Sequence, residues 1–414
     1  MRLGCAQPRN PVGQGVAEDR SWTIPSVASH CGHELAVVQN NAKEDPAVIV
    51  DVHAHVWPFP GREGYGSVKE RMQFQQRHSL WHMQGTLRLS DRKLVNKRTL
   101  HDGKGTGISN MYDVDFRVGD FGRLVWTYEG EHYYLPWMPV ALQGFEAPPE
   151  MMVAQMDALG VDVGVISRAH IYGRLNDYVA AAVEQFPGRL VASAEIDEWR
   201  AYEDGQIAEL HRCVEELDMR GLYFDGTESY FMVDYKTHYD RTEFVPFWQE
   251  VDDLNVPVQW HLRCRKQLSP ADFAQELRVF RAFVEKWPNI TFVITHCFEM
   301  SHFENGRLSD LALEICRLPN IHLELLFPIM NGGRWEYPYS EAREIIKQLY
   351  DEIGGEKMLW GSDMPAVERV CTYRQSLDYL RRHCEFIAPA DMEKILATNA
   401  MRLFRIEEET SPRA

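Results

Sequence analysis

The chain has 414 residues, of which 45% are hydrophobic and 25% are charged, the composition of an ordinary globular protein. Its 44 Lys and Arg face 61 Asp and Glu, and the formal charge of -17 disfavours nucleic acid and other polyanions as partners. No apolar run approaches the ~20 residues of a membrane helix, so we expect no membrane span.

Residues 1–46 mix Pro, Gly, Ser, Asn and charged residues without a hydrophobic period, which predicts a flexible N-terminal leader. The folded core is expected over residues 47–405, followed by a C-terminal tail at residues 406–414. Eight cysteines are scattered along the chain without paired spacing. This pattern favours free thiols and a cytoplasmic location.

Short runs rich in Val, Ile and Leu are typical of buried strands, and amphipathic stretches separate them. The predicted strands are residues 48–55, 161–168, 190–197, 219–225, 256–262, 290–296, 321–327 and 358–364. The predicted helices are residues 148–159, 176–186, 206–217, 270–287, 308–317 and 340–353. Alternation of this kind predicts an α/β fold, a (β/α)8 TIM barrel, in which chemistry collects at the C-terminal ends of the strands.

Residues 56–146 are too long for a simple connection, so we predict a large insertion after strand 1. Within it, residues 123–128 and 131–135 flank Glu129 and Gly130, which is the pattern of a β-hairpin. Because the insertion leaves the first strand at its C-terminal end, we expect it to cap the active site. An arm for assembly into a homo-oligomer is the alternative.

Ligand-type side chains stand at four of the predicted strand ends. His53 and His55 alternate at the end of the first strand, so both rings leave it on the same side. His261, His296 and Asp363 close the fifth, sixth and eighth strands. One such residue alone is more often a loop anchor, but all five at one end of a barrel predict a metal site.

Several motifs accompany these residues over positions 47–405. They are Asp51-Val-His53-Ala-His55, Met156-Asp-Ala-Leu-Gly160, Asn176-Asp177, Phe186-Pro-Gly-Arg189, Gly361-Ser-Asp363-Met-Pro365 and Ile395-Leu-Ala-Thr-Asn399-Ala-Met-Arg-Leu-Phe404. With these motifs the chain resembles the amidohydrolase superfamily, in particular the amidohydrolase-related branch that includes aminocarboxymuconate-semialdehyde decarboxylase. The motifs are specific for the branch and not for a substrate.

The resemblance implies that His53, His55, His261 and Asp363 ligate a divalent metal, and that His296 and Asp363 are catalytic groups beside the metal-bound water. A Zn2+ ion accepts nitrogen and oxygen ligands and lowers the pKa of a bound water from about 15.7 toward ~7. Mn2+ and Fe2+ accept the same ligands, so Zn2+ is the default expectation. This chemistry needs no organic cofactor.

The number of metal ions is open at this point. In binuclear members of the superfamily a carboxylate or carboxylated lysine on the fourth strand bridges two ions, and here that strand carries no lysine. Asp225 could bridge, or Glu228 beyond it, but capping of the next segment is the alternative, and we favour one metal. Glu324 on the seventh strand could orient a ligand histidine.

Further candidates follow other strand ends. Arg263 stands two residues after His261 and would suit a substrate carboxylate through a two-pronged contact, with a surface ion pair as the alternative. His170 and Tyr172 follow the second strand and are candidates either for substrate binding or for loop hydrogen bonds. The partner implied by this rim is a small-molecule substrate.

The leading hypothesis from the sequence is a metal-dependent hydrolase, in which a metal-activated water attacks the carbonyl of an amide, ester, lactone or thioester. The alternative is a metal-dependent nonoxidative decarboxylase of an aromatic or unsaturated carboxylic acid. A catalytically silent metal-binding protein is a third hypothesis, which His296 disfavours because the metal does not need it as a ligand.

Overall fold

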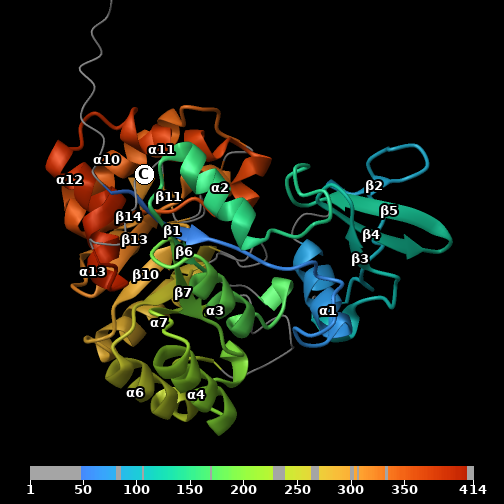
Figure 1. The fold of residues 1–414 in the computed structure, drawn as a ribbon, viewed down its shortest axis with the longest axis horizontal. Coiled ribbons are helices and arrows are strands. Elements are labelled where there is room, and N and C mark those ends of the chain that lie inside the picture. Colours follow the sequence, from blue (N-terminus) through green and yellow to red (C-terminus); the bar gives the residue numbers. More distant parts are fainter. Residues whose placement is uncertain are drawn as a thin grey trace, which may run out of the picture. The chain divides into compact units, whose positions relative to one another are not determined.

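Parallel strands form the centre of the protein in the computed structural model (Figure 1). The structure describes residues 48–80, 85–104, 107–167, 170–226, 238–262, 270–298, 303–304, 307–331 and 334–407. Eight strands make one sheet in the order β1-β6-β7-β8-β9-β10-β13-β14. They are β1 (Val50–Ala54), β6 (Val163–Ile166), β7 (Leu190–Ala194), β8 (Gly221–Phe224), β9 (Val258–His261), β10 (Phe292–Thr295), β13 (Ile321–Leu325) and β14 (Met358–Trp360).

The first and last strands of this sheet meet. Ala54 pairs in parallel with Met364, just beyond β14, and the N–H of His55 donates to the carbonyl of Met364 at 2.8 Å. The sheet therefore curls into a nearly closed barrel, and the predicted TIM barrel is confirmed. Each observed strand lies within its predicted run.

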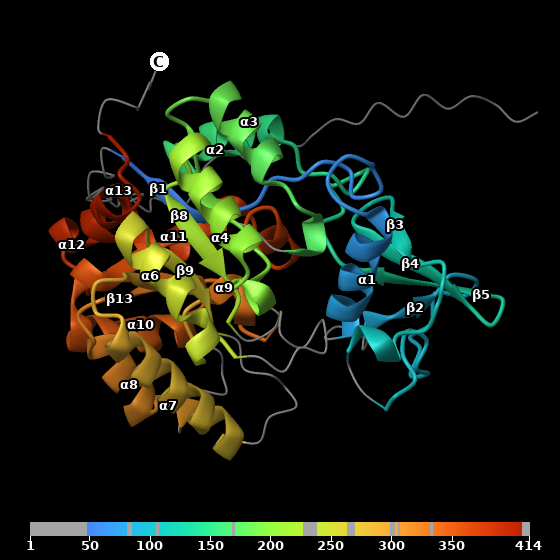
Figure 2. The same ribbon diagram turned by 90° about the horizontal axis from the view of Figure 1, so that it is seen from below.

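Helices lie outside the strands (Figures 1 and 2). They include α2 (Pro149–Leu159), α3 (Asn176–Gln185), α4 (Asp204–His211), α6 (Val245–Leu254), α7 (Pro270–Lys286), α8 (Asp310–Arg317), α9 (Phe327–Asn331), α10 (Ser340–Ile353), α11 (Tyr373–Arg381), α12 (Pro389–Glu393) and α13 (Asn399–Leu403). The helix predicted at residues 206–217 consists of α4 followed by one turn of π-helix at Arg212–Glu216. In the part of the chain that the structure describes, no helix combines the length and the apolar character needed to cross a bilayer.

Alternation along β1 explains how a buried strand can carry polar ligands. Val50 and Val52 pack outward in one apolar cluster with Leu403 of α13. Asp51 and His53 therefore face the inside of the barrel, because successive side chains of a strand point to opposite faces. All four side chains are fully buried.

Between β1 and α2 the chain forms a helix, α1 (Val68–Ser79), and a separate antiparallel sheet in the order β2-β5-β4-β3. Its strands are β2 (Leu87–Arg88), β3 (Arg117–Gly119), β4 (Arg123–Tyr128) and β5 (Glu131–Pro136). β4 and β5 pair from Arg123 with Pro136 to Tyr128 with Glu131, so the predicted hairpin is confirmed. The turn uses positive φ angles at Glu129 and Gly130.

The two ends of this segment are held together at the end of β1. The backbone of Trp57 exchanges hydrogen bonds of 2.8 and 3.0 Å with Ala147, and the Trp57 ring N–H donates to the Phe145 carbonyl at 2.7 Å. The chain thus leaves β1 and returns to the same place before α2 begins. The predicted leader at residues 1–46, Glu228 and Arg263 lie outside the described residues.

Candidate metal centre

The His55 ring is oriented by the end of the neighbouring strand β6. Its Nδ1 lies 2.9 Å from the carbonyl oxygen of Ser167, and a carbonyl can only accept, so Nδ1 carries the proton. In this tautomer of the ring, Nε2 is the nitrogen that carries the lone pair. That atom lies 2.9 Å from Asp363 Oδ1 and 3.1 Å from His53 Nε2.

The His53 ring is oriented from the other side of β1, by the strand β13, which lies next to β14. Its Nδ1 lies 3.0 Å from the Glu324 carboxyl group on β13, a contact that leaves Nε2 directed at His55. Burial, followed by the charge of His55, lowers the pKa of His53 to about 3. Burial raises the pKa of Glu324 to about 8. His53 is neutral at pH 7, which is the form of imidazole that ligates a metal.

His296 and His261 complete the group of rings. His296 Nε2 lies 3.8 Å from Asp363 Oδ2, and the His296 ring centre is 4.7 Å from that of His53 and 4.8 Å from that of His261. Ligand atoms of His53, His296 and Asp363 all lie within 4.8 Å of one another. The structure thus brings together the five side chains that the sequence predicts at this site.

Backbone geometry fixes two of these side chains. His296 and Asp363 both have φ near +60°, a left-handed conformation that costs a residue with a Cβ roughly 1–2 kcal/mol. The strands β10 and β14 end at Thr295 and Trp360, before the predicted positions, and the two residues follow them in this conformation. The N–H of Asp363 then donates to the carbonyl of His53 at 2.7 Å, which joins the two strand ends.

Asp51 ties the same two strand ends from inside the barrel. Its carboxylate accepts hydrogen bonds from the backbone of His53 at 3.1 Å, from the backbone and hydroxyl of Ser362, and from the Tyr373 hydroxyl at 2.8 Å. Burial raises the pKa of Asp51 to about 7, although these four donors each lower it. Asp51 therefore positions His53 against Asp363.

The charge states of the proton-handling residues are set by burial and by their contacts. Burial lowers the pKa of His296 to about 4, although the contact with Asp363 raises it. Burial also raises the pKa of Asp363, but contacts with His296 and His55 outweigh it and hold that pKa well below the usual range. An ionised carboxylate thus faces neutral imidazoles at neutral pH.

The donor set fits a divalent ion. Nε2 of His55 is an acceptor, and it faces His53 Nε2 and Asp363 Oδ1 across gaps of 3.1 and 2.9 Å. A tetrahedral ion with bonds of ~2.1 Å places its ligand atoms ~3.4 Å apart, close to these separations. Nitrogen and carboxylate oxygen are the ligands that Zn2+, Mn2+ and Fe2+ accept.

Tyr172 forms one wall beside this group. Its ring stacks on that of Trp57 at 4.0 Å and lies 5.7 Å from the His55 ring. Burial and then the charge of Asp363 raise the pKa of the Tyr172 hydroxyl, although Arg369 lowers it. Tyr172 keeps its proton at neutral pH and can donate a hydrogen bond.

The other predicted rim residues lie in different surroundings. His170 contacts Glu198 through Nε2 and Glu195 through Nδ1, so both of its ring nitrogens have partners within the protein. Asp225 Oδ2 lies 3.7 Å from His261 Nδ1, so the carboxylate is on the Nδ1 side of the ring and leaves Nε2 for a metal ion.

A family model described as an amidohydrolase matches residues 50–406 of the chain. The protein belongs to the amidohydrolase family. This enzyme is 24% identical over 355 residues to a gamma-resorcylate decarboxylase of Rhizobium sp. (strain MTP-10005), a match that covers 78% of this chain and 99% of the relative. The resemblance to the amidohydrolase superfamily found in the sequence is therefore confirmed.

Solved structures of low sequence identity are also similar to this amidohydrolase. A 2,6-dihydroxybenzoate decarboxylase from Rhizobium is 21% identical, with a TM-score of 0.46 over 62% of this chain and 88% of that one. A dihydroxybenzoic acid decarboxylase from Polaromonas sp. JS666, with bound manganese and the inhibitor 2-nitroresorcinol, is 19% identical, with a TM-score of 0.45 over 63% of this chain and 86% of that one.

Two residues near the centre of this amidohydrolase were not predicted. Tyr223 on β8 is buried, with its ring centre 6.2 Å from that of His53 and 6.4 Å from that of His261. It stands two positions before Asp225, so strand alternation in the sequence could have placed it on the inner face. Arg369 donates to the Trp137 carbonyl at 3.2 Å and lies over the Trp137 ring, and no local pattern distinguishes it.

Proposed function

We propose that this amidohydrolase is a metal-dependent nonoxidative decarboxylase of an aromatic carboxylic acid. The observation that carries the proposal is the match to gamma-resorcylate decarboxylase over 99% of that relative's length. It favours the decarboxylase alternative over hydrolysis, which was the leading hypothesis from the sequence. Buried ligands, an ionised Asp363 and the neighbouring aromatic wall support the same reaction.

We assign His53, His55, His261 and Asp363 as the ligands of one divalent ion, and His296 as the proton carrier. When bound, the ion would supply a positive charge that orients and polarises an acidic oxygen of the substrate. The Ser167 carbonyl and the Glu324 carboxyl group hold two of the ligand rings in place. Tyr223 fills the inner face of β8 beneath the rings, which supports a single ion.

Decarboxylation breaks the bond between a ring carbon and the carboxylate carbon. The electron pair stays on the ring carbon, which takes a proton, and carbon dioxide leaves. His296 would pass this proton to the ring carbon, because its Nε2 lies at the centre, 3.8 Å from Asp363 Oδ2. The Asp363 carboxylate would stabilise the charged form of His296 through which the proton moves.

The substrate would lie against the ring of Tyr172, which Trp57 supports from behind with a nearly parallel ring 4.0 Å away. Flat apolar walls favour a planar ring, and the Tyr172 hydroxyl offers it a donor. Arg369 and Arg263 are the candidates for its second acidic group. Residues 56–146 would form the outer wall, since Trp57 and Trp137 both belong to that segment and Trp137 contacts Arg369.

Turnover in heavy water tests the proposal. The protein loaded with Mn2+ or Zn2+ is incubated with a panel of hydroxybenzoic acids, and carbon dioxide release and the product spectrum are recorded. We expect carbon dioxide and a product with one deuterium at the carbon that carried the carboxylate. Oxygen from labelled water in the product of an acyl substrate, without carbon dioxide from any acid, would instead establish hydrolysis.

A further inference from the structure

A cluster of charged side chains surrounds three largely buried carboxyl groups in the loop after β7. Glu195, Asp197 and Glu198 belong to this loop, and His170 reaches them from the turn His170–Tyr172. His170 Nε2 is bonded to Glu198, and its Nδ1 lies 3.3 Å from Glu195 Oε1. The exposed fraction of the His170 and Glu198 side chains is 9% and 1%.

The cluster is charged despite its burial. Burial alone lowers the pKa of His170, but the carboxylates of Glu198 and Glu195 outweigh it and raise that pKa to about 10. Two arginines balance the remaining carboxylate, because Arg174 and Arg200 lie 2.8 and 2.6 Å from Asp197. Three cations thus face three carboxylates in this cluster.

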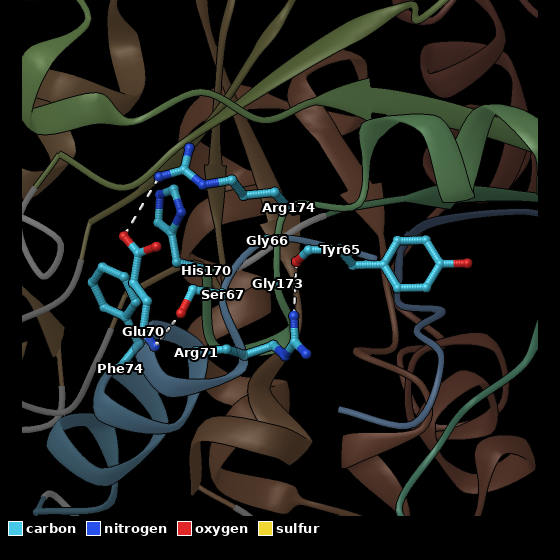
Figure 3. Close-up of a pocket in the computed structure, with 9 residues that line it drawn as sticks. All are labelled: Tyr65, Gly66, Ser67, Glu70, Arg71, Phe74, His170, Gly173 and Arg174. Atoms are coloured by element: carbon cyan, nitrogen blue, oxygen red, sulfur yellow. Dashed lines mark hydrogen bonds and ion pairs between the residues drawn. The ribbon is translucent and has the colours of Figure 1, made fainter. Parts of the chain in front are cut away.

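The same cluster borders a surface pocket beside α1. His170, Arg174, Glu70 and Phe74 line this pocket, with Arg174 paired to Glu70 at 3.6 Å (Figure 3). The His170 ring also packs against Phe74, with ring centres 5.9 Å apart. Arg174 and His170 pair with Glu70 and Glu198, so the pocket offers them no obvious ligand. The contacts that the cluster makes with the strand ends of the barrel therefore say more about its role.

Glu198 connects the cluster to the metal centre. Its Oε1 accepts a hydrogen bond of 3.2 Å from the backbone N–H of Asp225, the residue that follows β8. The Asp225 carboxylate in turn lies 3.7 Å from Nδ1 of His261. One side chain therefore contacts both the His170 cation and the strand end that faces His261.

We propose that Glu198 is a positioning residue, which holds the Asp225 carboxylate beside His261 and so fixes the direction of the His261 ring. The inference rests on the proposed function, because it takes His261 as a metal ligand. A carboxylate behind a ligating imidazole fixes both its tautomer and its orientation, and loss of such a partner typically weakens metal binding 10–100-fold. His170 fixes Glu198 by occupying its other oxygen.

Binding of Mn2+ alone to the metal-free protein tests this role. Free Mn2+ is measured by its paramagnetic resonance signal during titration of the wild type, Glu198→Ala, Glu198→Gln and Arg200→Gln. We expect Glu198→Ala to raise the Kd about tenfold or more. Glu198→Gln keeps an oxygen for the Asp225 N–H and should recover most of the affinity. Arg200→Gln removes a cation from the same cluster without touching Asp225, and its Kd should match that of the wild type.

Thermal unfolding of each variant separates positioning from general stability. A wild-type Kd in folded Glu198→Ala would overturn the inference, as would equal weakening by Arg200→Gln. If Glu198→Ala does not fold, Asp225→Asn takes its place, because it keeps the backbone bond and loses only the charge behind His261. Wild-type affinity in Asp225→Asn would overturn the inference and leave the proposed function standing. Failure of the wild type itself to bind Mn2+ or Zn2+ would overturn both.

Discussion

Two buried pairs of histidine and glutamate in this protein have opposite charge states. His53 and Glu324 lie 3.0 Å apart, and burial lowers the pKa of His53 to about 3 and raises that of Glu324 to about 8. The side chains of His170 and Glu198 are slightly more exposed, at 9% and 1%, and the pKa of His170 rises to about 10. Both members of the first pair therefore favour their neutral forms at neutral pH when no cation is bound, whereas His170 in the second pair is an imidazolium.

The difference comes from what surrounds each ring. His53 is surrounded by His55 and His261, which oppose a further positive charge, and Asp363 only partly offsets them. His170 has carboxylates at both ring nitrogens and a third, Asp197, nearby. Neutral imidazoles can accept a metal ion, whereas a cation held between carboxylates can only support the structure around it.

The largest effect on turnover is expected at Asp363 and His296, where the ionised carboxylate meets the proposed proton carrier. We predict that Asp363→Asn and His296→Asn each lower turnover by about 10³-fold or more, because proton transfer by a positioned group contributes about 10²–10⁴-fold. Steady-state rates of the loaded variants measure this effect. Circular dichroism and thermal unfolding should stay close to the wild type. Near-normal turnover in either variant would remove the proposed mechanism.

The second effect separates ligand from proton carrier. We predict that His261→Asn weakens Mn2+ binding about 100-fold or more, while His296→Asn changes it less than about threefold, because only His261 is assigned to the ion. Titration of the metal-free proteins gives both values. The reverse order would make His296 the ligand, which its place in one compact group with His53 and Asp363 would then explain.

The third effect acts on the neutral pair itself. Glu324→Gln keeps the size of the side chain but cannot ionise to a carboxylate beside His53 Nδ1 when a cation binds, and we predict Mn2+ binding about 10–100-fold weaker. Calorimetric titration measures the change. The control is Glu250→Gln, which removes a carboxylate from His211 on the helices α4 and α6 and should leave Mn2+ binding unchanged. Unaltered binding by Glu324→Gln would show that the Ser167 and Asp51 contacts suffice to orient the ligands.

The smallest effect is a pH dependence of the charged pair. The folded pKa of His170 lies above its ordinary value, so its contribution to stability is complete below about pH 6.5 and is lost as the pH rises through about 10. Burial raises the pKa of Glu198, which offsets part of this contribution. We predict that His170→Gln lowers the free energy of unfolding by about 1–3 kcal/mol at pH 6 and by less at pH 10.

Denaturant unfolding of the wild type and His170→Gln at pH 6, 8 and 10 gives the difference directly. Other alkaline titrations occur in both proteins and cancel in that difference. A gap that stays constant over this range would mean that His170 is neutral in the fold, and the contrast between the two pairs would disappear.

The barrel could be predicted because its signals are local. Each strand is a short apolar run, and the alternation of Val50 and Val52 with Asp51 and His53 marks the inner face of β1. The hairpin at residues 123–136 is equally local, since its turn residues lie between its two strands. The five central side chains could be found because each stands at the end of such a run.

Contacts between distant segments could not be predicted from single runs. Asp51 and Tyr373 are hydrogen-bonded although they are 322 positions apart in the sequence, and His170 and Glu198 are 28 positions apart. No sequence periodicity links the members of either pair. The positive φ angles of His296 and Asp363, which follow the ends of β10 and β14, could not be predicted either, because residue type does not reveal them at these positions. The capping role of residues 56–146 and the two flanking tails stay predictions.

The central claim is that three strand ends hold one divalent ion, beside the proton carrier His296 on a fourth. The metal content of the purified protein, followed by Mn2+ titration of its metal-free form, tests the claim most directly. The account predicts close to one ion per chain, with binding lost in Asp363→Asn and retained in Arg200→Gln. A ratio near two, or binding that survives removal of Asp363, would contradict it.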